Sequence, residues 1–186
     1  MPKNKFLTAI EEGDLQTVKT LLLNPDNNKF DMEGALITAA DYGHIEIVQF
    51  LIENNTEINH INSTKDTALM LAAEQGHENI VKILITNGAN VNYINKDYDT
   101  PLLLATKKGY IKIVNLLITN GTNINYINKN DDTALLLAAE QGHTKIVNLL
   151  ITNCANVNHK TKFGNTALTK AAKNGHLNVV DLLITN

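Results

Sequence analysis

The chain has 186 residues, 44% of them hydrophobic and 19% charged, which is the composition of an ordinary soluble protein. Its formal net charge of −3 excludes a broad cationic field, so we expect neither nucleic acid nor an anionic membrane surface as its partner. A single cysteine excludes an internal disulfide framework, and no apolar run is long enough to cross a bilayer.

The first expected element is a short helical unit from Phe6 to Leu23. Its Ala9 recurs thirty residues later as Ala39. An Asn-Pro-Asp turn signal follows at 24–26. Because this unit carries more charged residues than the later ones, we interpret it as a degenerate terminal cap.

A second unit begins at Gly34, where the later units have threonine, so we expect its first helix to lack a hydroxyl cap. Four further units begin at threonines that are spaced by 33 residues: Thr67, Thr100, Thr133 and Thr166. A fixed period of this length predicts a repeat protein.

The unit that starts at Thr133 shows the expected local structure most clearly. Thr133 places a side-chain oxygen before an apolar run, where it can accept from the free N–H groups of a first helical turn. The pattern predicts a helix over 134–141, and Gly142 then supplies the positive φ that ends it. A second apolar stretch over 146–151 predicts a second helix. Neither helix is long enough to be stable alone, so the helix pairs must stack on one another.

Segments rich in Asn and Asp connect the helix pairs. The segment from Ala89 to Asp99, with alternating Val91 and Ile94, predicts an extended, hairpin-like finger. No low-complexity linker or shift in composition divides the chain, so we expect a single domain over 1–186. Its units are expected at about 4–33, 34–66, 67–99, 100–132, 133–165 and 166–186.

These motifs resemble the ankyrin repeat. The residues that carry the resemblance are Thr100-Pro101-Leu102 with Ala105, Gly76-His77, Gly142-His143, Gly175-His176 and Gly88-Ala89-Asn90-Val91-Asn92. The resemblance implies an all-α solenoid of about six stacked helix-turn-helix units with hairpin-like fingers. It also implies a concave face, lined by the fingers and the first helices, that binds other proteins.

The sequence departs from the family pattern in two ways. The histidine of the family's Thr-Pro-Leu-His element is absent from every unit, so packing must replace its hydrogen bonds. The family's glycine two residues before the threonine survives only as Gly164, and Lys65, Tyr98 and Asp131 stand in its place elsewhere. We therefore expect these fingertips to be tighter or differently turned.

Four histidines recur in the turn between the helices of a pair: His44, His77, His143 and His176. A metal ladder is excluded because equivalent side chains in stacked helices lie about 10 Å apart, whereas zinc–nitrogen bonds measure about 2 Å. We expect these histidines to bond backbone groups instead.

No motif for catalysis or for cofactor binding is present, so we expect a protein that is not an enzyme and needs no cofactor or metal. Cys154 takes the place of Gly88 and Gly121, which indicates drift at a glycine position that costs about 1 kcal/mol if the backbone there is left-handed.

A finger asparagine recurs as Asn59, Asn92, Asn125 and Asn158. The resemblance permits asparaginyl hydroxylation there, while a hydrogen bond that stabilises the finger is the other interpretation.

The expected partner-binding residues lie at the fingertips, in a row of large rings on the fingers, and at the ends of the first helices. They are Tyr42, Asp66, Tyr93, Lys96, Tyr98, Asp99, Lys107, Lys108, Tyr126, Lys129, Asp132 and Phe163. Tyr93, Tyr98 and Tyr126 are the expected anchors, since tyrosine is the best anchor type in a chain without Trp or Arg. Two alternatives stay open: the rings stack one finger on the next, and the charges pair between neighbouring units.

The predicted function is therefore a scaffold that binds an unidentified protein through its concave face. The alternative is that the chain is the repeat portion of a larger multidomain or effector protein whose activity lies elsewhere. We expect a cytoplasmic or otherwise intracellular location, with secretion into a host cell by an unrecognised signal left open. The apolar last helix, without cap character, predicts fraying of its last turn and self-association through that end, or else a longer natural chain.

Overall fold

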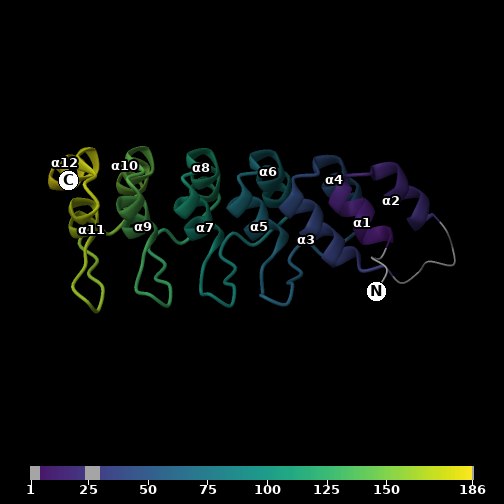
Figure 1. Cartoon of the computed structure of the whole chain (residues 1–186), viewed down its shortest axis with the longest axis horizontal. Coiled ribbons are helices and arrows are strands. Elements are labelled where there is room, and N and C mark those ends of the chain that lie inside the picture. The colour runs from purple at the N-terminus through teal and green to yellow at the C-terminus, as the bar shows by residue number, and fades with distance from the viewer. Residues whose placement is uncertain (1–4, 24–29, 186) are drawn as a thin grey trace. The chain divides into compact units, whose positions relative to one another are not determined.

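The computed structural model describes residues 5–23 and 30–185, and within these ranges the chain forms twelve helices and no strand (Figure 1). The chain divides into two compact units, Met1–Asn90 and Val91–Asn186. We call them unit 1 and unit 2 and describe each by itself. The predicted turn at 24–26 and the last residue of the chain lie outside the described residues. The assignment of residues 1–186 to a single domain stays a prediction.

Unit 1 contains three helix pairs. Their bounds are α1 Lys5–Glu12 and α2 Leu15–Leu22, α3 Met32–Tyr42 and α4 Ile45–Glu53, and α5 Ala68–Gln75 and α6 Glu78–Thr86. The first helices α1, α3 and α5 pack in sequence against one another, and the second helices α2, α4 and α6 do the same. Successive pairs therefore stack in register, as the 33-residue period predicts.

Unit 2 repeats this arrangement with three more pairs. They are α7 Pro101–Lys108 and α8 Ile111–Thr119, α9 Ala134–Gln141 and α10 Thr144–Thr152, and α11 Ala167–Lys173 and α12 Leu177–Ile184. Helix α9 packs between α7 and α11, and α10 packs between α8 and α12. The helix predicted over 134–141 is confirmed at both ends.

The core of each unit is a row of equivalent apolar side chains rather than one central cluster. In the α9–α10 pair, Leu136, Val147 and Leu150 are fully shielded from solvent. Small residues such as Ala138 and Ala139 are also fully buried and let neighbouring helices approach closely. Each pair covers its apolar surface with the pairs on either side, so stability comes from stacking.

The predicted threonine caps are confirmed. The hydroxyl of Thr133 accepts from the backbone N–H of Leu136 at 3.3 Å, and Thr67, Thr100 and Thr166 cap their helices in the same way. The structure corrects the expectation for the second repeat, which lies in unit 1. Its first helix, α3, begins earlier than Gly34, at Met32. The Asp31 carboxylate caps this helix by accepting from the Gly34 N–H at 2.8 Å. The helix lacks a hydroxyl cap but not a cap.

The turn glycines have the positive φ that the sequence predicts. Gly142 ends α9 with a φ of 74°, and a Cβ added there would lie 2.6 Å from Nδ1 of His176. Glycine is therefore required at this position for two reasons: the backbone has a positive φ, and a side chain would clash with the histidine of the next pair.

The fingers are extended loops with a tight turn at each tip. The expectation of tighter or differently turned tips is wrong, because Lys65, Tyr98 and Asp131 adopt positive φ values of 62°, 60° and 63°, close to the 80° of Gly164. The hydrogen bonds are equivalent as well: Tyr98 N–H donates to the Asn95 carbonyl at 3.0 Å, as Gly164 N–H does to Thr161 at 2.8 Å. The chain keeps the turn and accepts the strain of a left-handed residue that is not glycine.

Among the residues that the structure describes, no helix is long and apolar enough to cross a membrane.

Candidate partner-binding face

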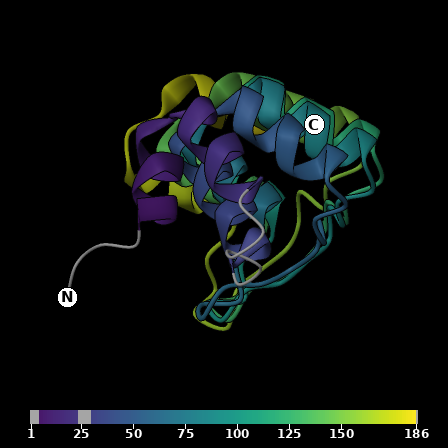
Figure 2. The same ribbon diagram turned by 90° about the vertical axis from the view of Figure 1, so that its right-hand side faces the viewer.

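Most of the predicted contact residues lie in unit 2, on a surface that we call the finger face. It consists of the fingers 91–99, 122–132 and 155–165 together with the first helices α7, α9 and α11. Figure 2 shows that the fingers of this unit project from the helices on one side. Each finger leads directly into a first helix, so the cap at the start of that helix also fixes the base of the finger.

Finger asparagines fasten each finger to the next. Asn92 Nδ2 donates to the Gly121 carbonyl at 3.2 Å, and its Oδ1 accepts from Asn123 N–H at 2.7 Å. Asn125 makes the same two bonds, to Cys154 and Asn156, at 3.2 and 2.8 Å. The interpretation that these asparagines stabilise the fingers is thus confirmed for Asn92 and Asn125, whereas Asn158 makes no equivalent bond among the described residues. Asn59 makes the equivalent bonds within unit 1, to Gly88 and Asn90.

The turn histidines join neighbouring helix pairs. Nε2 of His176 lies 2.9 Å from the Glu140 carbonyl, and His44 and His77 make equivalent bonds within unit 1 to Glu11 and Asp41. The expectation that these histidines bond backbone groups is confirmed for all three. His143 differs, since its buried Nε2 has no hydrogen-bond partner among the described residues.

Two of the predicted contact residues pair with each other inside the finger face. The Asp99 side chain is 7% exposed, and its Oδ2 lies 2.5 Å from the Lys107 ammonium. Its other oxygen accepts from Asn128 Nδ2 of the next finger at 3.1 Å. Asp99 thus ties its own finger to α7 and to the following finger, which argues against its use in contacting a partner.

Asp132 is used in the same way. Its carboxylate lies 2.7 Å from the ammonium of Lys170, which also contacts Glu140 at 3.1 Å. Burial alone would lower the pKa of Lys170, but hydrogen bonds and charge attraction from the two carboxylates outweigh it and raise that pKa. The hypothesis that charges pair between neighbouring repeats is supported at this site.

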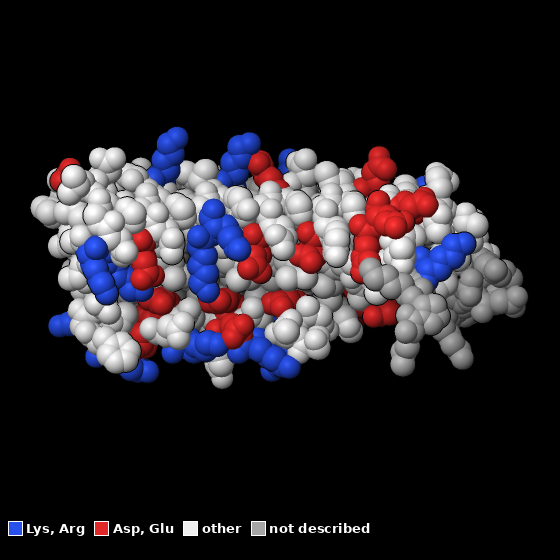
Figure 3. Space-filling model, in the orientation of Figure 1, with Lys and Arg blue, Asp and Glu red and all other residues white. Residues whose placement is uncertain are grey.

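Ion pairs also cross between the exposed fingertips of unit 2. Lys129 pairs with Asp97 and holds the pKa of that carboxyl below its ordinary value, and Lys162 lies 3.7 Å from Asp131. Figure 3 shows Lys and acidic side chains interspersed on the visible face of unit 2. Ion pairs at such exposed positions contribute little to stability, so a partner can compete for these lysines.

The predicted aromatic anchors separate into two groups. Tyr98 and Phe163 are 56% and 89% exposed at their fingertips. Tyr93 and Tyr126 are only half-buried on the sides of the fingers, where burial and the nearby Asp99 charge raise the pKa of Tyr126. His159, in the same row of rings, lies with Nε2 2.9 Å from the Asp131 carbonyl of the previous finger. This bond supports the alternative that the row of rings stacks the fingers.

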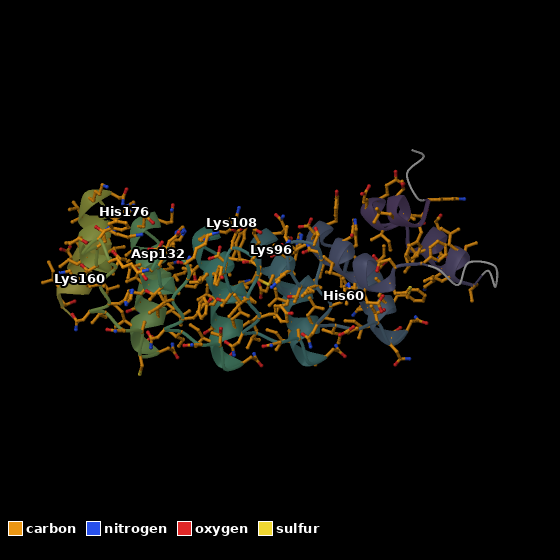
Figure 4. All side chains as sticks on the ribbon, turned by 90° about the horizontal axis from the view of Figure 1, so that it is seen from below. His60, Lys96, Lys108, Asp132, Lys160 and His176 are labelled. Atoms are coloured by element: carbon orange, nitrogen blue, oxygen red, sulfur yellow. The ribbon has the colours of Figure 1, made fainter. Side chains whose placement is uncertain are left out.

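The remaining predicted contacts are mostly solvent-exposed. Lys96 lies on the first finger of unit 2 and Lys108 at the end of α7, and both are exposed (Figure 4). In unit 1, Tyr42 is 54% exposed at the end of α3, while Asp66 accepts a hydrogen bond from the Thr64 hydroxyl at its own fingertip. Tyr42 is thus available for contact, whereas Asp66 helps to order its turn.

A comparison with protein-family models matches a model of three ankyrin repeat copies to residues 6–95, 36–128 and 102–186. The chain belongs to the ankyrin repeat family. The fold class and the family suggested by the motifs are thereby confirmed, while the exact number of repeats is approximate. A comparison with curated proteins finds no match. Ankyrin repeats are generally modules for protein–protein interaction and are typically not enzymes.

The ankyrin repeats of unit 1 also form a hollow that the sequence did not reveal. It measures about 660 Å³ and lies between α1, α3 and the finger 56–66. Leu7 and Asp31 line it, and neither was predicted as a contact residue. Leu7 belongs to a helix that was interpreted only as a cap, and Asp31 falls in a connection without a recognised motif. Spacing alone does not show that these segments meet.

Proposed function

We propose that this ankyrin repeat protein is a non-enzymatic scaffold that binds a protein partner through the finger face of unit 2, which corresponds to the concave side in the family. The observation that carries the proposal is the exposure of Tyr98 and Phe163 at two fingertips. Large aromatic side chains lose favourable burial when they face water, and they are among the best interface anchors because few rotamers are lost on binding.

The contact set is narrower than the sequence suggested. Tyr98, Phe163, Lys96 and Lys108 are exposed, and Lys129 can exchange a weak exposed pair for a partner's carboxylate. Asp99, Lys107 and Asp132 form a second group, which holds the fingers and helices in place and contributes to binding only indirectly. Tyr93 and Tyr126 are half-buried and offer less surface to a partner. This division predicts which substitutions separate binding from stability.

The test is affinity capture with variants that leave the fold intact. Tyr98→Asn keeps a residue that tolerates positive φ, and it should weaken binding on the order of tenfold without lowering the melting temperature. Lys107→Glu is a poor choice because it would place a carboxylate against the buried Asp99. Lys108→Glu changes an exposed residue at the end of α7, and Lys112→Glu changes an exposed residue on the second helix α8 as its matched control.

We expect the Lys108 variant to bind the partner more weakly, with an affinity that depends less on salt concentration. The Lys112 variant should keep the affinity and the salt dependence of the wild type. If a partner keeps its affinity for the variants Tyr98→Asn, Phe163→Ser and Lys108→Glu, it must bind elsewhere. The assignment of the finger face would then be wrong. The alternative, that these repeats are part of a larger effector protein, is tested by the full open reading frame.

Self-association is the second proposed interaction. Leu168 on α11 is 37% exposed, although its equivalent Leu135 on α9 is 1% exposed, and Leu177 and Ile184 on α12 are 73% and 67% exposed. We call these three exposed residues, Leu168, Leu177 and Ile184, the apolar end. Their exposure supports the sequence prediction of an uncovered apolar surface.

A further inference from the structure

The hollow in unit 1 is lined by apolar and polar side chains, and part of its lining faces solvent. Leu7 of α1, Tyr42 of α3, Ile61 of the finger and Leu71 of α5 contribute to its lining. Leu7 and Tyr42 are 40% and 54% exposed, so part of this apolar surface faces solvent. A volume of about 660 Å³ is within the usual range for ligand pockets, and it is large enough to admit one or two side chains of a partner.

The charged groups that line the hollow all have the same sign. Asp31, Asp41 and Glu11 contribute to the lining, and no lysine does so among the described residues. The hydrogen bonds found for the first two carboxylates come from neutral donors: Gly34 N–H at 2.8 Å for Asp31 and Gln75 Nε2 at 2.9 Å for Asp41. Neutral donors order these carboxylates but leave their charge in place.

The surrounding sequence strengthens this potential. Residues 1–90 contain 6 lysines and 13 acidic residues, whereas residues 91–186 contain 10 lysines and 6 acidic residues. The overall charge of −3 therefore conceals a net −7 in unit 1 and a net +4 in unit 2. Figure 3 shows acidic side chains gathered on the visible face of unit 1. An acidic hollow in an acidic unit favours cationic segments.

We propose that the hollow of unit 1 binds a cationic peptide segment of a partner protein. One apolar side chain of the segment inserts between Leu7, Tyr42 and Leu71, and flanking Lys or Arg side chains lie beside Asp31 and Asp41. His60, on the finger that borders the hollow, adds a hydrogen-bonding group to the lining, and Figure 4 labels it. The inference rests on the proposed protein-binding function but not on the finger face of unit 2.

A second hollow, on unit 2, carries no comparable preference. It measures about 690 Å³ between α8, α10 and α12, with Ile111, Leu149 and Leu182 in its lining. Its charged lining consists of Lys145 and Asp181, which offset each other. It therefore offers no charge complementarity that would select a partner.

The test uses three fluorescent peptides of equal length. The first is Lys-Lys-Gly-Leu-Gly-Lys-Lys, the second replaces its leucine with serine, and the third replaces its lysines with glutamates. We expect the first to bind most tightly, the second about tenfold more weakly because an apolar side chain is not buried, and the third not measurably. Binding of the first should weaken between 50 and 300 mM salt.

The location is tested by two double variants with the same change in charge. Asp31→Asn with Asp41→Asn removes two charges from the hollow, and asparagine retains both the helix cap and the acceptor for Gln75. Glu46→Gln with Glu53→Gln removes two exposed charges from α4, outside the hollow. We expect roughly a fivefold loss of affinity for the first pair and less than twofold for the second.

A third variant, Leu7→Lys, places a cation at the exposed mouth and should abolish binding of the cationic peptide while circular dichroism stays unchanged. Equal binding of the glutamate peptide, equal effects of the two double variants, or no effect of Leu7→Lys would each overturn the proposal. If the finger face still captures its partner in that case, only the hollow is misassigned. If Tyr98→Asn and Phe163→Ser have no effect while the peptide binds the hollow, only the finger-face proposal fails.

Discussion

Cys154 occupies a left-handed turn position, with a φ of 64°. Its equivalents Gly88 and Gly121 have φ values of 90° and 83°, and a Cβ added to either glycine would meet no atom within 4 Å. Strain at this site therefore lies in the backbone and not in a clash. A left-handed residue other than glycine costs roughly 1–2 kcal/mol, while glycine loses about 0.4–1 kcal/mol more through the entropy of the unfolded chain.

We accordingly predict that Cys154→Gly raises the free energy of unfolding by about 0.5 kcal/mol. Urea denaturation should show a higher midpoint with an unchanged slope. Cys154→Ala is the control, because it removes the thiol and retains the left-handed strain, so it should give no gain. Equal stabilisation by both variants would show that the thiol, and not the backbone, is unfavourable.

Lys170 makes the stability of unit 2 sensitive to alkaline pH. Its ammonium is held by Asp132 and Glu140, and its pKa is raised above the ordinary 10.5. A raised pKa means that the folded state holds this proton more tightly than the unfolded state does. The contribution to stability is thus complete below pH 10.5 and is lost as the pH rises through the folded-state pKa.

We predict that Lys170→Met lowers the free energy of unfolding by about 2 kcal/mol at pH 7, because two carboxylates lose their cation. The variant should also lose less stability than the wild type when the pH is raised above 10.5. Tyr126, whose pKa is also raised, is retained in both proteins, so its alkaline effect cancels in the comparison. Parallel pH profiles of unfolding for the two proteins would contradict this account of Lys170.

At the scale of the elements, the fingers depend on one another through their asparagines. Asn125 bonds Cys154 and Asn156, where the next finger begins, through both ends of its amide. Asn158 is the equivalent residue one finger later, and its side chain forms no hydrogen bond among the described residues. The two positions therefore provide a matched pair of substitutions.

We predict that Asn125→Ala lowers the free energy of unfolding by about 1–3 kcal/mol, the net value of two hydrogen bonds, whereas Asn158→Ala changes it by less than about 0.5 kcal/mol. Hydrogen exchange should show faster opening of the finger 155–165 in the first variant only. Equal effects of the two substitutions would mean that the asparagines act within their own finger.

The elements were predictable wherever a local pattern determines them. The caps at the repeat threonines and the glycine turn at Gly142 follow from a few adjacent residues, and the structure confirms them. Asp31 was missed as a cap because alignment on the threonine position placed the helix start at Gly34, too late in the chain. The strained tips were missed because the absence of glycine suggested a different turn, although local hydrogen bonds to Asn62, Asn95 and Asn128 hold the same one.

The candidate site was less predictable, since sequence does not show which charges are already used. Asp99 looks like a fingertip contact, yet it pairs with Lys107 and Asn128, which lie 8 and 29 residues away. Asp132 finds Lys170 at a separation of 38 residues. Such partners meet only when fingers and helices stack, and that geometry is absent from the local pattern.

At the scale of the whole chain, the unequal charges of the two units bear on self-association. Unit 1 carries a net −7 and unit 2 a net +4, so two molecules can attract one another through opposite charges. The apolar end, with Leu177 73% exposed, offers a different mode that is based on burial of apolar surface. The two modes respond oppositely to salt, because screening weakens attraction between charges while sulfate and similar salts strengthen apolar burial.

We predict that association occurs through the apolar end. Sedimentation at increasing protein concentration should show a dimer that persists in 0.5 M sodium sulfate and that Leu177→Ser with Ile184→Ser abolishes. Leu7→Ser, which removes a 40% exposed leucine from the opposite end of the sequence, is the control and should leave the dimer intact. A dimer that dissociates in salt and persists in the double variant must instead be held together by the opposite charges of the two units. The exposure of Leu177 and Ile184 would then need another explanation, such as a partner of different sequence that covers them.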